Sequence, residues 1–98
     1  VTAHGVDTGH PPLPCEGYNL SKWQAMCYFN RAKIVTALEQ RNDYKYSECI
    51  VFGRANYLGK PVTWEIRAGG TASFRSYTDE VRTLLADPKK KISLSQKL

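Results

Sequence analysis

The sequence predicts a single α+β domain in which one main helix packs on a twisted antiparallel sheet. Three observations support this fold class. Apolar residues recur with helical spacing over residues 20–40, apolar and polar residues alternate over 44–53 and 61–68, and the chain has only 98 residues. One domain is expected at this length, because domains usually run to about 100–150 residues. The six Tyr, three Phe and two Trp supply enough bulk for one core.

The main helix is expected over residues 20–40. Asn19 or Ser21 can cap its start, and Ser21 with Gln24 has the spacing of a capping box, in which each side chain bonds to the backbone N–H of the other residue. The polar cluster at 41–43 is expected to end it. The apolar stripe that should face the sheet consists of Leu20, Trp23, Cys27, Ile34 and Leu38, widened by Met26 and Val35.

Two strands are expected at residues 44–53 and 61–68, where apolar and polar residues alternate. Glycines predict turns at 53–59 and at 69–70. We expect the helix stripe to bury against the inward-facing residues of the strands, which are Ile50, Phe52, Val62, Trp64 and Ile66. The other face of the second strand carries Thr63, Glu65 and Arg67.

Residues 76–86 fit two patterns. Ser76 has a carboxylate three positions on, and the apolar residues that follow share one helical face, which predicts a second C-terminal helix and an α-β-β-α arrangement. The same stretch can form a strand at Val81–Leu85, followed by a turn at Asp87–Lys89 and a partner strand at Ile92–Leu94. Periodicity favours the helix.

The first 14 residues are rich in Gly and Pro, so we expect a flexible N-terminal arm before a domain that covers residues 15–98. Both histidines, His4 and His10, lie in this arm, which is a poor mount for a general acid or base. Together with Cys15 and Cys27 they match no short ligand pair of a structural zinc site. The sequence therefore predicts no catalytic residue, no metal and no cofactor.

The three cysteines, Cys15, Cys27 and Cys49, give different expectations in different compartments. A small secreted domain should form one disulfide and keep one free thiol, whereas a cytosolic protein should keep all three as buried thiols. The small size and aromatic-rich middle of the chain favour the secreted protein. No apolar run approaches the about 20 residues of a membrane span, and we expect a monomer that is not bound to a membrane.

The net charge of +5 is concentrated in residues 20–41 and in the C-terminal tail. Such basic segments can attract phosphate backbones or an anionic partner, or simply keep a protein soluble. Basic and aromatic residues also interleave from Tyr44 to Trp64, and this combination commonly holds single-stranded RNA, although some of the aromatics must serve the core. The predicted RNA-binding residues are Tyr44, Lys45, Tyr46, Arg54, Tyr57, Lys60 and Arg67.

The order of several short motifs carries a resemblance to a known family. Cys-Glu-Gly at Cys15–Gly17 precedes the helix, and Asn-Tyr-Leu-Gly-Lys-Pro-Val at Asn56–Val62 follows the Tyr-rich strand. A Gly-Gly turn then leads to Asp-Glu-Val at Asp79–Val81 and to the turn at Asp87–Lys89. This order resembles the small guanyl-specific fungal ribonucleases and their non-catalytic relatives, the effectors that powdery mildew fungi secrete into plant cells. The resemblance implies a helix on an antiparallel sheet, with residues 76–86 as a strand.

The resemblance also implies that catalysis is lost. Active members use a Tyr, a neighbouring His, a Glu base, an Arg and a final His. Tyr44 or Tyr46 can stand for the tyrosine, but the other four positions hold Lys45, Gly59, Glu80 and Ser95 or Gln96. The family's C-terminal Cys is also missing, so Cys15 pairs with Cys27 or Cys49 or stays free.

The function that follows is a secreted, catalytically inactive ribonuclease-like effector. It would bind host RNA or a host protein, such as a plant immune receptor, inside the host cell. Two alternatives stay open: an active ribonuclease toxin of another lineage that uses Lys45, Tyr46, Arg67 or His10, and a small interaction module such as an inhibitor or immunity protein. If the protein binds RNA, Lys60→Glu and Arg54→Glu are expected to weaken RNA retention.

Overall fold

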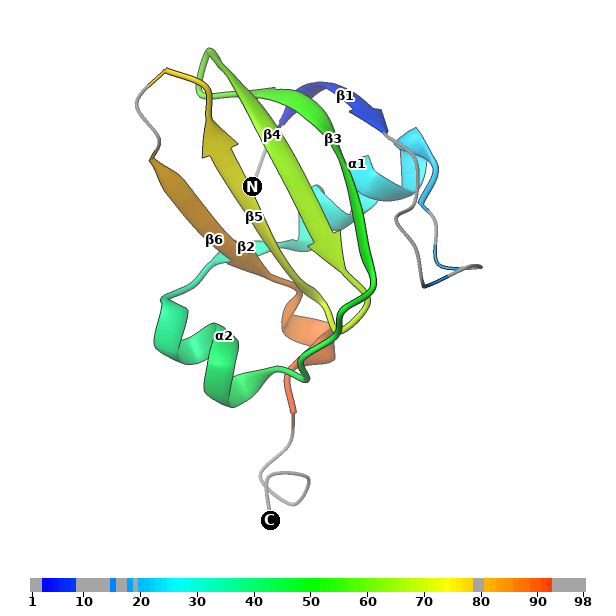
Figure 1. Ribbon diagram of the computed structural model, residues 1–98, viewed down its shortest axis with the longest axis vertical. Helices are drawn as coiled ribbons and strands as arrows, with labels where there is room; N and C mark the ends of the chain where they lie inside the picture. Colours follow the sequence, from blue (N-terminus) through cyan, green and yellow to red (C-terminus); the bar gives the residue numbers. More distant parts are fainter. Residues whose placement is uncertain (1–2, 9–14, 16–17, 19, 79–80, 93–98) are drawn as a thin grey trace.

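The computed structural model describes residues 3–8, 15, 18, 20–78 and 81–92. It confirms the α+β class, with helices packed on one antiparallel sheet whose strands follow the order β1-β3-β4-β5-β6-β2 (Figure 1). The helices are α1 (Lys22–Arg31) and α2 (Ala37–Asp43), and a 3-10 turn follows at Pro88–Lys90. The strands are β1 (His4–Thr8), β2 (Lys33–Ile34), β3 (Ile50–Tyr57), β4 (Lys60–Arg67), β5 (Thr71–Ser76) and β6 (Arg82–Ala86).

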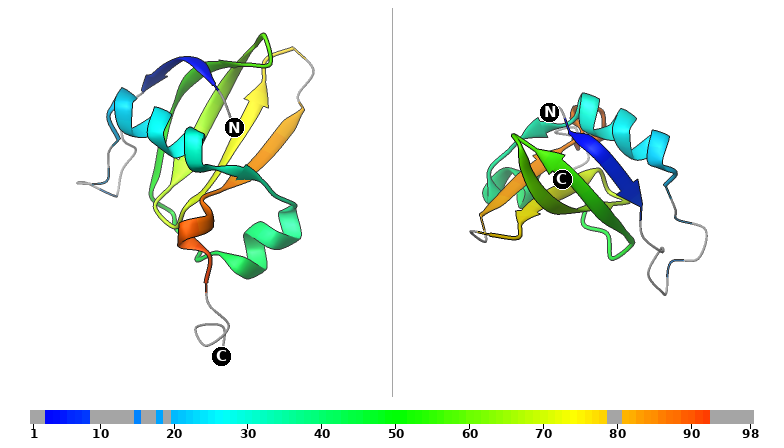
Figure 2. Two further views of the ribbon diagram at one scale, coloured as in Figure 1. Left: turned by 180° about the vertical axis from the view of Figure 1, so that it is seen from behind. Right: turned by 90° about the horizontal axis from the view of Figure 1, so that it is seen from above.

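The core lies between α1 and one face of the sheet, which α1 crosses (Figure 2). At its centre is Phe29 of α1, whose ring centroid lies 5.5 Å from that of Trp64 and 4.9 Å from that of Phe74. The inward-facing residues of β4 are buried as predicted: Val62, Trp64 and Ile66. Burying an apolar side chain of this size contributes about 1.5–3 kcal/mol before the entropy of ordering the chain.

The prediction of one helix over residues 20–40 is wrong, because two helices joined by the short strand β2 occupy this stretch. Ile34, Val35 and Thr36 are consecutive β-branched residues, and such side chains lose rotamer freedom in a helix. Thr36 then caps α2 through a capping box with Glu39. The predicted capping box at the start of α1 is confirmed, and α2 ends inside the predicted 41–43 cluster.

The predicted apolar stripe is also wrong. Trp23 is 71 % exposed, and Ile34 and Leu38 are each 61 % exposed. The buried side of α1 is instead formed by Ala25, Tyr28 and Phe29, since a small alanine lets the helix approach the sheet closely. The predicted stripe was chosen by the size of its apolar residues, and it therefore marks an exposed side of the helices rather than the side that packs on the sheet.

Strand β3 begins at Ile50 rather than at residue 44, and it continues through the turn predicted at 53–59 as far as Tyr57. The turn itself is Leu58–Gly59, with φ angles of 53° and 76° that match the twist of a tight hairpin. The predicted inward face of this strand is inverted: Val51, Gly53 and Ala55 face the core, Ile50 is half-buried, and Phe52 is 47 % exposed on the opposite face.

Residues 82–86 form strand β6, which pairs with β5, so the second helix at 76–86 and the α-β-β-α alternative are wrong. Pairing with β5 satisfies the backbone and buries Leu85, and this outweighs the helical pattern. Asp87 caps the turn after β6 by accepting a hydrogen bond from the Lys89 N–H at 3.0 Å. Of the strand predicted at Ile92–Leu94, Ile92 is not in a strand and residues 93–94 lie outside the described residues.

The segment expected to be an N-terminal arm contains strand β1, which pairs with β3 and places Val6 in the core. Residues 9–14 of that segment lie outside the described residues. Cys15 and Cys49 form a disulfide, and Cys27 is a free, half-buried thiol. The expected single disulfide is therefore present, and it is compatible with an extracellular protein. No helix in the described part of the chain is long and apolar enough to cross a membrane.

Candidate nucleic-acid interface

On the sheet face opposite α1, the pairing of β3, β4, β5 and β6 arranges the side chains in three rows, in which Thr71, Ser73 and Ala86 are buried and the others are at least partly exposed. The first row is Arg54, Thr63, Arg75 and Arg82. The second row is Phe52, Glu65, Ser73 and Leu84. The third row is Ile50, Arg67, Thr71 and Ala86. We call these three rows the outer face.

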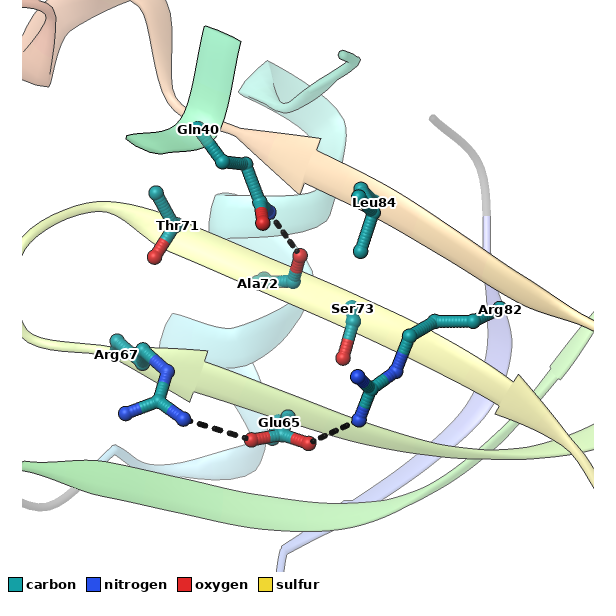
Figure 3. Close-up of a pocket in the computed structure, with 8 residues that line it drawn as sticks. All are labelled: Gln40, Glu65, Arg67, Thr71, Ala72, Ser73, Arg82 and Leu84. Atoms are coloured by element: carbon teal, nitrogen blue, oxygen red, sulfur yellow. Dashed lines mark hydrogen bonds and ion pairs between the residues drawn. The ribbon is translucent and has the colours of Figure 1, made fainter. Parts of the chain in front are cut away.

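Glu65 lies at the centre of the outer face, between two arginines. Its Oε1 atom is 3.5 Å from Nη2 of Arg82, and its Oε2 atom is 3.7 Å from Nη2 of Arg67 (Figure 3). Because these side chains are partly exposed, each pair contributes at most about 1 kcal/mol to stability. The pairs therefore position charge more than they stabilise the fold.

The first row concentrates positive charge. Arg75 lies directly opposite Arg82, and like charges in such cross-strand pairs destabilise a sheet. Among the described side chains, no carboxylate forms an ion pair with Arg75, and Arg54 lies opposite Asp7 of β1 in the sheet. Glu65 is the only acidic residue in the three rows, so the outer face carries a net positive charge that an anion would relieve.

Three neighbouring hollows that share lining residues follow one another across the outer face, and we call this row of hollows the outer groove. The first, of about 330 Å³, lies over Phe52, Glu65 and Arg75. The second, of about 120 Å³, shares Glu65 with the first. The third, of about 250 Å³, shares Arg67 with the second and extends to Tyr46 beside α2.

Two exposed aromatic side chains lie at opposite ends of the outer groove. Phe52 is 47 % exposed in the first hollow, and Tyr46 is 73 % exposed in the third. The guanidinium carbon of Arg67 is 5.5 Å from the centre of the Tyr46 ring, within range of a cation–π contact. Arg67 is held in turn by donating from Nη1 to the Ser47 carbonyl at 2.8 Å.

Helix α2 forms one wall of the groove. Its Gln40 donates from Nε2 to the carbonyls of Ala72 and Leu85, each at 2.9 Å. These two residues are paired across β5 and β6, so a single side chain fixes the helix to both strands. The capping box at Thr36 explains why a helix of only seven residues forms at this position.

Of the predicted RNA-binding residues, several meet at the α2 end of the groove: Tyr44, Lys45, Tyr46 and Arg67. Tyr44 is buried there, and burial, followed by the nearby Asp43 carboxylate, raises the pKa of its hydroxyl. Arg54 lies in the first row of the outer face. Five of the seven predicted residues therefore lie on the outer face or along the outer groove.

Tyr57 and Lys60 are not brought to that surface. They line a separate, largely apolar hollow of about 140 Å³ on the α1 side of the sheet. The Tyr57 ring stacks on Phe74, with centroids 4.8 Å apart. Their position points to packing at the end of the core rather than to contact with a ligand in the outer groove.

Sequence reasoning missed several groove residues: Gln40, Phe52, Glu65, Arg75 and Arg82. The alternation along residues 61–68 did place Glu65 and Arg67 on one outward face. Phe52 was assigned to the core through the inverted face of β3. Reading residues 76–86 as a strand would have placed Arg82 on the outer face.

Among the positions that the resemblance assigns to catalytic groups, Tyr44, Lys45 and Tyr46 line the α2 end of the outer groove, and Gly59 lies in the hairpin turn between β3 and β4. Three further positions, Glu80, Ser95 and Gln96, lie outside the described residues. Within the described ranges, no group of three His, Cys, Asp or Glu side chains could hold a metal ion.

Comparison with known proteins assigns no family to the chain. No protein-family model matches it, and no similar curated protein or solved structure was found.

Proposed function

We propose that the protein binds single-stranded RNA in the outer groove without cleaving it, as a secreted ribonuclease-like effector that acts in a host cell. The observation that carries the proposal is the outer groove itself, which is lined by arginines and has an exposed aromatic ring in the hollow at each end. Cationic side chains neutralise phosphates, and aromatic rings stack on bases.

The groove favours a single strand over a duplex. A duplex hides the faces of its bases, so Phe52 and Tyr46 could stack only on bases that are unpaired. The cations of the outer face are arginines, whose guanidinium groups bind phosphate oxygens well, and this favours affinity for the backbone over recognition of a particular sequence. We therefore expect binding that depends strongly on salt and weakly on sequence.

Binding without cleavage is supported by the chemistry of the groove. Cleavage of RNA by proton transfer needs a base and an acid with pKa values near the working pH. Glu65 is held between two guanidinium groups, which is an arrangement of ion pairs rather than of a base beside an acid.

The test is to measure binding and degradation of a labelled RNA oligonucleotide by the same protein. Arg75→Glu is expected to weaken binding at least about tenfold, because a charge-assisted hydrogen bond is replaced by repulsion. Lys22→Glu is the matched control: it makes the same charge change at an exposed position of α1, on the other side of the sheet, and should have little effect.

Two outcomes would contradict the proposal. Arg75→Glu and Lys22→Glu could weaken binding equally, which would mean that only net charge matters. Alternatively, the protein could cleave RNA robustly and lose that activity on one substitution, which would favour an active ribonuclease. Lys60→Glu separates the sequence-based prediction from the groove, since its position on the α1 side predicts a smaller effect than Arg75→Glu.

A further inference from the structure

The orientation of the Gln40 side-chain amide is fixed by its partners. The carbonyl oxygens of Ala72 and Leu85 can only accept hydrogen bonds, and each lies 2.9 Å from the same side-chain nitrogen. The amino group must therefore face the sheet, and both of its hydrogens are used. The Oε1 atom is left turned toward the groove, as Figure 3 shows.

This oxygen is an acceptor without an internal donor. No donor among the described residues bonds to Oε1 of Gln40. The oxygen borders the 120 Å³ hollow, whose opposite side is formed by Arg67, Glu65 and Arg82. The hollow thus presents a fixed acceptor facing a pair of cations, and the hydroxyls of Thr71 and Ser73 line its floor.

A nucleotide offers the complementary pattern. Its phosphate oxygens accept hydrogen bonds from arginine, while its ribose hydroxyl and its base amino groups donate. Of these donors, the 2′-hydroxyl is bonded to the carbon next to the one that carries the 3′-phosphate. A phosphate held by Arg67 or Arg82 would therefore bring this hydroxyl, rather than a base amino group, into the same small hollow.

We propose that Gln40 Oε1 accepts a hydrogen bond from the ribose 2′-hydroxyl of a bound nucleotide, so that the groove prefers RNA to DNA. This inference rests on the proposed RNA-binding function and adds a basis for selecting the sugar. One neutral hydrogen bond corresponds to a preference of about three- to tenfold for RNA.

The test compares oligouridine with oligodeoxyuridine of the same length at fixed salt, because the two differ only in the 2′-hydroxyl. The wild-type protein should bind oligouridine more tightly by the stated factor. Gln40→Lys keeps donors for the two carbonyls but has no acceptor, so its preference should fall to about one. The added positive charge strengthens binding of both oligonucleotides, and it cancels in the ratio.

Asn42→Lys is the matched control, since it adds the same charge to the exposed surface of α2 without touching Gln40. It should strengthen binding of both oligonucleotides and leave the preference unchanged. A 2′-O-methyl oligouridine tests the same bond on the wild-type protein, because methylation removes the donor. It should bind about as weakly as the deoxy form, even if Gln40→Lys does not fold.

Equal binding of the ribo and deoxy oligonucleotides by the wild type would overturn the inference and leave RNA binding standing. Binding of neither would overturn both proposals. A comparison of oligocytidine with oligouridine distinguishes the 2′-hydroxyl from a base amino group as the donor to Gln40 Oε1. Gln40→Lys could lower a preference for oligocytidine and leave the ribo-to-deoxy ratio unchanged. In that case the oxygen accepts from a base amino group, and the assignment to the 2′-hydroxyl is wrong.

Discussion

At the scale of single residues, the most informative position is Glu65. Its carboxylate holds Arg67 and Arg82, the same cations that a phosphate would need. It therefore keeps two arginines in place, and it would compete with a phosphate for them if the outer groove binds RNA as proposed. In the free protein, the Glu65 carboxylate thus occupies the position beside Arg67 and Arg82 that an external anion could take.

Glu65→Gln is expected to tighten RNA binding by about three- to tenfold, because it removes a negative charge beside the bound phosphates. Stability should change by less than about 1 kcal/mol, since both ion pairs are partly exposed. The measurement is an RNA titration together with urea unfolding. Glu48→Gln, at an exposed position before β3, is the control. Weaker binding by Glu65→Gln would show that the carboxylate itself contacts RNA.

Tyr28 predicts how stability depends on pH. Burial, and then the Asp87 carboxylate, raise the pKa of its hydroxyl, which donates to the Gly70 carbonyl at 2.7 Å. The folded protein holds this proton more tightly than the unfolded chain does. Below about pH 10 both states carry the proton, so the free energy of unfolding should not change with pH on account of Tyr28. Above that pH, stability should fall as the unfolded chain ionises first.

Urea unfolding between neutral pH and pH 11 measures this effect. Tyr28→Phe should be slightly less stable near neutral pH, by about 0.5–1.5 kcal/mol for the lost hydrogen bond, and should lose less stability in alkali. Ser21→Ala, which removes a helix cap and no titrating group, is the control and should keep the wild-type dependence on pH. An identical alkaline slope in the wild type and Tyr28→Phe would contradict the assignment.

At the scale of elements, the short helix α2 forms the wall of the groove and holds Gln40. Thr36→Ala should destabilise the protein by about 1 kcal/mol, because it removes the side chain that caps the helix. It should also weaken RNA binding. Ser21→Ala removes the equivalent cap of α1 at a similar cost but should leave RNA binding unchanged, since α1 lies on the other face. If the two substitutions had equal effects on RNA binding, α2 would not be part of the RNA-binding groove.

The same elements show what the sequence could predict. The cap at Ser21 and the alternation along β4 depend on neighbouring residues, and both were found. The inward face of β3 depends on which side α1 covers, and small residues such as Gly53 and Ala55 face it while Phe52 lies outside. Strand β6 gains its backbone partners from β5, so its helical pattern was misleading. The groove was only partly predicted because it combines side chains from strands whose register no local pattern reveals.

At the scale of the whole molecule, the two helices leave the sheet unequally covered. Helix α1 lies across one face and forms the core with it, whereas α2 walls only part of the other face (Figure 2). The net charge of +5 makes association with an anionic polymer favourable over a distance set by salt.

The disulfide ties the N-terminal part of this molecule to the segment before β3. Cys15 and Cys49 are 34 residues apart in sequence, so their link should stabilise the fold by about 3–4 kcal/mol through the entropy of the unfolded chain. Urea unfolding of a Cys15→Ala, Cys49→Ala variant measures this. Cys27→Ala, which leaves the disulfide intact, is the control. Thiol titration should find one free thiol in the unfolded, unreduced protein, and finding three would contradict the pairing.

The salt dependence of RNA binding tests the outer groove most directly. The logarithm of the RNA dissociation constant is measured against the logarithm of salt concentration for the wild type, for Arg75→Glu combined with Arg82→Glu, and for Lys22→Glu. Each lost phosphate contact lowers the slope by about 0.7–1, so the double variant should lose about 1.5–2 and Lys22→Glu almost nothing. A wild type that retains no RNA, or equal slopes in all three proteins, would contradict the assignment of RNA to the outer groove.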